Sequence, residues 1–255
     1  MELNFKIKDK SDKGFKLRET KLSNFKKKGF PNKREEEWKF TDLEKILNEN
    51  FKELNNEKKK KKKPNILNLG FDHNSIILIN GKLESFNFKF ENFKDKDSLP
   101  IRKLELDYHL NFADEIKENS MQNLNTALHE GGFSLNANPD YQFKCPIVIF
   151  NYFSGVLKNK MINNSEIINM SKNSNATIIE YLIDESSGCF FKNTFKYLNI
   201  EEGASLDYYF INKNESKSFF YDFSKVKLSS NASFKKYIFS SGIKLIKLSN
   251  ICDKS

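Results

Sequence analysis

Three histidines and three cysteines are the side chains of this 255-residue chain best suited to binding a metal. In sequence order they are His73, His109, His129, Cys145, Cys189 and Cys252. They are widely separated, no Cys-x-x-Cys pair occurs, and no histidine has ligand spacing to another histidine or cysteine. We therefore expect structural or surface roles for the histidines. Three scattered cysteines also speak against a disulfide framework and favour a reducing compartment.

Cys189 lies beside Gly188, close to an expected turn. To bind a metal cluster it would need to be a thiolate, with partners brought close by folding. A free cysteine more often packs as a small buried hydrophobe, and the spacings to Cys145 and Cys252 do not match the repeat described below. We expect Cys189 to be buried and inert, with cluster binding as the alternative.

Glu201 and Glu202 are adjacent carboxylates, the residue type that performs acid–base chemistry on sugars. They precede Gly203 at an expected turn, so we interpret them as a solvent-exposed corner. The sequence has no Gly-x4-Gly-Lys-Ser/Thr loop for ATP, and three scattered histidines give no Ser–His–Asp triad. We therefore assign no catalytic and no metal-binding residue from the sequence.

The formal charge is +9, from 43 basic against 34 acidic residues, and residues 58–63 are six consecutive lysines. Such a run repels itself and is typical of a solvated linker; a nucleic-acid or membrane tether is the alternative. No apolar signal segment follows Met1, and no stretch of about 18 apolar residues occurs. These observations predict a cytoplasmic protein.

A repeat organises the second half of the chain. Ala176, Ala204 and Ala232 lie in similar settings 28 residues apart, each before a run rich in β-branched and aromatic residues. The same offset aligns two further sets, which are Ile167, Phe195 and Phe223, and Met170, Leu198 and Val226. A fixed period of this size indicates a solenoid. Because the units resemble strands joined by turns, the pattern predicts stacked β coils with equivalent residues in one column.

The first 57 residues have a different pattern, with apolar residues at helical spacing. One helix is expected to end before residues 29–31, Gly-Phe-Pro, and a second to begin at Thr41 with Glu44 completing a capping box. The expected apolar face of the second helix is Leu43, Ile46, Leu47, Phe51 and Leu54.

The middle of the chain combines strands and short helices. Asn80-Gly81 between two strand-like runs predicts a β-hairpin, and residues 112–116 and 121–128 predict short helices. From Phe133 to Ile251 we expect strands and turns without a helix. The predicted organisation is a helical lobe (1–57), a lysine-rich linker (58–65), a connecting region (66–132) and a β-helix core (133–255).

Residues 29–43 carry the sole tryptophan in the order Gly-x-Pro, a basic residue, then Glu-x-Trp-Lys-Phe-Thr-Asp-Leu. This order resembles the N-terminal signature of the SufD members of the SufB/SufD family. Further stretches that resemble the family are residues 77–82, 124–132, 146–149, 177–181 and 193–209. The resemblance extends over roughly residues 15–250.

The resemblance implies a right-handed parallel β-helix and a role as a non-catalytic scaffold in iron–sulfur cluster assembly. It implies a SufB-like paralogue and a SufC-like ABC ATPase as partners. An iron–sulfur cluster or a flavin is expected only in the full complex. Members of the family continue into a C-terminal helical domain that docks the ATPase, so the chain is expected to be C-terminally truncated at Ser255. An uncapped solenoid end predicts aggregation or pairing, including homodimers, through residues 234–251.

Two other functions remain open. Parallel β-helices also occur in polysaccharide-acting enzymes, but such enzymes display clustered acidic and basic residues on one strand face, and we expect no such cluster here. The lysine run would suit a nucleic-acid-binding protein. Trp38, with Phe40 and Leu43, is interpreted as the anchor of the helical lobe, with Arg34 and residues 35–37 as its solvated rim; a partner-binding patch is the alternative.

Overall fold

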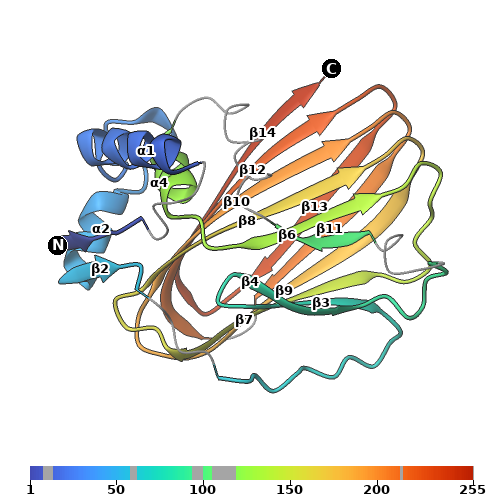
Figure 1. Ribbon diagram of the computed structural model, residues 1–255, viewed down its shortest axis with the longest axis horizontal. Coiled ribbons are helices and arrows are strands. Elements are labelled where there is room, and N and C mark those ends of the chain that lie inside the picture. The colour runs from blue at the N-terminus through green and yellow to red at the C-terminus, as the bar shows by residue number, and fades with distance from the viewer. Residues whose placement is uncertain (8–13, 58–61, 94–99, 105–118, 213–214, 255) are drawn as a thin grey trace.

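The protein is mainly β, a parallel β-solenoid of about four turns preceded by a helical lobe (Figure 1). The computed structural model describes residues 1–7, 14–57, 62–93, 100–104, 119–212 and 215–254. His109, the expected helix at 112–116 and residues 58–61 of the lysine run lie outside these residues. Each helix in the described part of the chain is too short or too polar to cross a membrane.

Two six-stranded sheets form the walls of the solenoid (Figure 1). The lobe sheet, whose outer face packs on the helical lobe, consists of β5 (Ile101–Lys103), β6 (Gly132–Ala137), β8 (Met161–Met170), β10 (Phe191–Ile200), β12 (Ser216–Leu228) and β14 (Ile243–Lys254). The opposite sheet consists of β4 (Lys82–Asn87), β3 (Asn74–Ile79), β7 (Ile147–Val156), β9 (Asn175–Ser187), β11 (Ser205–Asn212) and β13 (Ser233–Ser240). Pairing is parallel except at β3–β4 and β5–β6, the first pairs of each sheet.

Alternation along each strand sends every second side chain into the space between the two sheets, which we call the lumen. Parallel pairing then stacks equivalent inward residues. Leu135, Ile168, Leu198 and Val226 form one such column, and all four are 2 % exposed or less. Burial of these columns provides the apolar core that holds the coils together.

The spacing between coils is not constant, which corrects the expected period. Ala204 and Ala232 lie at equivalent positions, each one residue before the pair Ser205–Ser233, but Ala176 lies opposite Leu206. The first coil is therefore 30 residues long and the second 28.

The aligned apolar sets show the same offset. Ile168, not Met170, lies opposite Leu198, and Ile167 lies opposite Tyr197 instead of Phe195. The segment from β9 to β10 has two more residues than the segment from β11 to β12, whereas the four-residue turns before β9, β11 and β13 keep the same length.

The N-terminal lobe comprises α1 (Phe15–Lys28), the 3₁₀ turn η1 (Glu36–Trp38) and α2 (Leu43–Asn50). Gly29 ends α1 at φ 75°, a conformation that favours glycine. The cap of α2 is Asp42, whose carboxylate accepts from the Lys45 amide at 3.0 Å, so the expected cap at Thr41 was wrong by one residue. The expected apolar face of α2 is correct, because Leu43, Leu47, Phe51 and Leu54 are buried and Ile46 is partly buried.

A short parallel pair, β1 (Glu2–Asn4) and β2 (Glu53–Asn55), joins the two ends of the lobe and was not expected. The Asn80-Gly81 hairpin is confirmed, with φ of 51° and 80° at its two turn residues. The expected helix at 121–128 is confirmed as α4 (Ser120–Leu128). Figure 1 shows α4 beside α1, where both lie against the lobe sheet.

Gly132 provides a test of the coil stack. Its φ is +144°, and a Cβ placed there would lie 1.7 Å from the carbonyl oxygen of Ser165 on the next coil. Gly132→Ala should lower the free energy of unfolding by at least about 2 kcal/mol, because strained backbone alone costs about 1–3 kcal/mol. Urea unfolding followed by circular dichroism measures this. Gly70→Ala, where the added methyl group meets nothing within 4 Å, is the matched control, and equal midpoints for the two variants would contradict the expectation.

Candidate functional site

The lumen contains a group of charged side chains at inward strand positions. We call it the luminal ion cluster: Glu166 on β8, Glu180 on β9, Lys192 and Lys196 on β10, Tyr208 on β11, Asp222 on β12 and Lys236 on β13. Six of these seven are less than 9 % exposed, and Lys236 is partly exposed. Charged groups this deeply buried are rare unless they are paired.

Lys196 lies at the centre of the cluster. Its ammonium contacts the Glu180 carboxylate and donates to the Tyr208 hydroxyl at 2.9 Å, and the Tyr208 hydroxyl donates in turn to Glu180 at 2.7 Å. The ammonium also lies 3.2 Å from Asp222 Oδ2 and 3.3 Å from Glu166 Oε2. One cation therefore holds three carboxylates that come from three different strands.

The pKa values of these groups diverge because their partners differ. Burial disfavours a charged Glu180, but the ammonium groups of Lys196 and Lys192 and two hydrogen bonds outweigh it and hold its pKa at about 2. Burial likewise raises the pKa of Glu166, to about 7, and the attraction of Lys196 does not offset it. For Lys196 burial acts against the charge, yet Asp222, Glu166 and Glu180 bring its pKa well above the ordinary value. Lys196 and Glu180 are thus a firm ion pair.

The edge of the cluster faces the last coil. Lys236 donates to Asn250 Oδ1 at 3.1 Å and to Ser224 Oγ at 3.3 Å. At the other end, Asn151 donates to Glu180 Oε1 at 3.1 Å. The cluster therefore links side chains of every coil from β7 to β14, and it can fix how the coils align as well as hold charge in the lumen.

Sequence reasoning missed this cluster. We expected no group of acidic and basic residues on one strand face, and that expectation was wrong. The signal was present as charged residues on the same alternate positions as core aliphatics, as in Glu166 before Ile168 and Lys196 before Leu198. Glu166 and Glu180 are 0 % exposed, so a polysaccharide chain cannot contact them in this structure.

The tryptophan-bearing stretch forms the joint between the lobe and the late coils. Trp38 is 3 % exposed, and its ring lies 5.3 Å from that of Tyr221 on β12. Lys247 of β14 donates to the Glu37 carbonyl at 2.7 Å and lies 5.0 Å from the Trp38 ring centroid. The expected packing role of Trp38 is confirmed, with Arg34, Glu36 and Glu37 as its exposed rim. Phe40, by contrast, is 89 % exposed.

The cysteines lie apart from one another and from the cluster. Cys145 and Cys189 are half-buried and Cys252 is exposed, all as free thiols. Cys189 lies 3.2 Å from the Lys217 carbonyl, and burial raises the pKa of its thiol to about 11, which disfavours the thiolate that a metal requires. Among the described residues no group of three or more His, Cys, Asp and Glu side chains is placed to hold a metal ion.

The remaining expected positions have structural surroundings. His73 Nδ1 lies 2.8 Å from the Phe71 carbonyl, and its ring packs edge-on against Phe150. His129 is buried at the C-terminal cap of α4, the helix end where it was expected. Glu202 pairs with Lys172 at 3.0 Å on the surface, at the corner predicted from the sequence.

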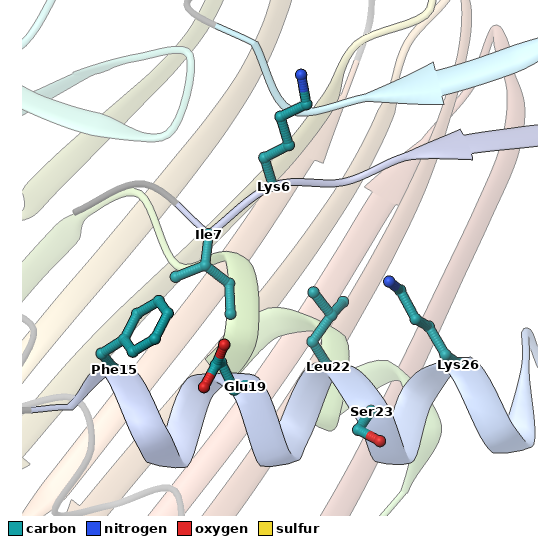
Figure 2. A pocket seen from close by; sticks show the side chains of 7 residues that line it. All are labelled: Lys6, Ile7, Phe15, Glu19, Leu22, Ser23 and Lys26. Atoms are coloured by element: carbon teal, nitrogen blue, oxygen red, sulfur yellow. The ribbon is translucent and has the colours of Figure 1, made fainter. Parts of the chain in front are cut away.

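An open cleft of about 640 Å³ lies in the lobe, between the chain after β1 and α1. Figure 2 shows side chains of α1 facing Lys6 and Ile7 across this cleft. Its walls combine apolar and charged side chains: Lys6, Ile7, Phe15, Glu19, Leu22, Ser23 and Lys26. This composition indicates no particular ligand.

Residues 5–69 match the family model described as the SufBD protein N-terminal region. The match spans about a quarter of the chain, including α1, Trp38 and α2. No curated protein matches the chain significantly. The match supports a relationship to the SufB/SufD family, which is associated with iron–sulfur cluster assembly.

Lys196 should be essential to the folded state. Lys196→Met leaves three buried carboxylates without their shared cation and should cost about 3–5 kcal/mol of unfolding free energy. Lys172→Met removes an exposed ion pair with Glu202 and should cost less than about 1 kcal/mol. Urea unfolding of both variants at pH 7 provides the comparison. Similar losses in the two variants would show that the cluster does not hold the coils together.

Proposed function

We propose that this protein is a SufD-like, non-catalytic scaffold subunit of an iron–sulfur cluster assembly complex in the cytoplasm. The observation that carries the proposal is that the segment matching the family's N-terminal region packs, through Trp38, on the coils of a β-solenoid. The solenoid was predicted from the sequence repeat, independently of the family match. Agreement between the two supports the SufD-like assignment along the whole chain.

The partners in this proposal are a SufB-like paralogue and a SufC-like ABC ATPase. The late coils offer the surface for the paralogue, because β13 and β14 are the last strands of their sheets and carry exposed apolar side chains. Ile238, Phe239 and Ile251 are 47 %, 58 % and 37 % exposed. An open strand edge with apolar neighbours pairs readily with another chain.

A scaffold role also suits the chemistry of the described residues. The raised pKa of Cys189 and the burial of the luminal ion cluster favour support of a partner's chemistry over catalysis by this chain. The iron–sulfur cluster is then the cargo of the assembled complex. The polysaccharide alternative loses ground, because the clustered carboxylates that would serve it are enclosed in the lumen.

Affinity purification of the tagged protein from its native host tests the proposal. We expect a SufB-like protein and a SufC-like ATPase to co-purify, identified by mass spectrometry. Phe239→Ser should reduce recovery of the SufB-like protein by about tenfold or more, the effect of losing one apolar interface contact. Phe86→Ser changes a similarly exposed phenylalanine on β4, at the other edge of the same sheet, and should leave recovery unchanged.

Recovery of neither family member would contradict the proposal. Recovery of only a second copy of this chain would point to homodimers in place of the SufB-like partner. Equal losses in Phe239→Ser and Phe86→Ser would reject the late-coil surface while leaving the partners intact.

A further inference from the structure

Glu166 differs from the other carboxylates of the luminal ion cluster. It is 0 % exposed, and neither of its carboxylate oxygens has a hydrogen-bond partner among the described residues. The nearest cation, Lys196 at 3.3 Å, directs its hydrogen bonds to Glu180 and Tyr208 instead. An ionised carboxylate in this position loses its hydration and gains no hydrogen bond in return.

The groups that face Glu166 do not supply a full counter-charge. Lys196 and Lys192 on β10 attract it, while Glu180 on β9 and Asp222 on β12 repel it. On the β6 side its register partner is the apolar Phe133.

Beyond these groups lie the Tyr208 hydroxyl on β11 and the Lys236 ammonium on β13, which is committed to Ser224 and Asn250. The deep part of the cluster therefore has three carboxylates, those of Glu166, Glu180 and Asp222, for the two ammonium groups of Lys192 and Lys196. A proton on Glu166 removes the excess negative charge.

We propose that Glu166 is a proton-binding site in the lumen, and that proton uptake there stabilises the stacking of the coils that contain β8, β10 and β12. The ligand is a single proton, bound at a carboxylate oxygen. The site makes the stability of the coil stack sensitive to pH near neutrality, and it does not depend on the function proposed above.

The direction of the effect follows from the pKa of Glu166. Burial raises this pKa from 4.5 to about 7, so between these values the folded chain keeps a proton that the unfolded chain releases. The stability that Glu166 contributes is complete below pH 4.5 and is lost as the pH rises through about 7. Glu180, with a pKa of about 2, remains ionised throughout this range.

Glu166→Gln tests the proposal, because glutamine imitates the protonated carboxyl group and cannot titrate. We would measure urea unfolding of the full chain from pH 5 to pH 8.5. The ratio of the wild-type unfolding constant to that of Glu166→Gln should rise by up to about tenfold per pH unit to pH 7, then level off. Glu202→Gln, at the exposed corner, should give a ratio that does not change with pH.

A structural readout accompanies the titration. At pH 7.5 the amides of β8, β10 and β12 should exchange hydrogen more slowly in Glu166→Gln than in the wild type, while those of β1 and β2 should be unchanged. A ratio independent of pH for Glu166→Gln, or unchanged exchange in these strands, would overturn the proposal.

If Glu166→Gln does not fold, the wild type still decides the question. Infrared spectra should then show the C=O stretching band of a buried, protonated carboxyl group at pH 5.5 that disappears by pH 8.5. Absence of this band at pH 5.5 would overturn the proposal as well.

Discussion

Parallel stacking of the coils in register is the constraint on which the rest of this structure depends. Each strand of the solenoid pairs residue by residue with the strand of the next coil, so inward side chains form continuous columns. The columns supply the apolar core, and the same geometry places a charged residue of one coil against those of its neighbours. A shift by one residue would turn every inward side chain outward.

The luminal ion cluster and the lobe joint are two consequences of this register. Inside, Lys196 of β10 can reach carboxylates of β8, β9 and β12 only because those strands are neighbours or face each other across the lumen. Outside, the opposite side chains of the lobe sheet receive the helical lobe, where Trp38 contacts Tyr221. The segment that matches the family model is thereby joined to the last coils, and this joint supports an assembly role for the whole molecule.

The sequence predicted the solenoid, the Asn80-Gly81 hairpin, the helix at 121–128 and the packing of Trp38, because each depends on a local pattern or a repeat. It did not predict the two-residue change in coil length, since a repeat read at one offset cannot reveal an extension inside β9. The ion cluster was missed for the same reason. Glu166, Glu180 and Lys196 become neighbours only when the register between distant strands is known.

Disulfide trapping tests the register most directly. In a chain whose native cysteines are replaced by serine, Asn169→Cys and Asn199→Cys occupy paired positions on β8 and β10, where parallel strands bring Cα atoms about 5 Å apart. We expect this pair to oxidise rapidly, and the pair Asn169→Cys with Tyr197→Cys, at the spacing of 28, to remain reduced. Rapid closure of the second pair and not the first would contradict the account.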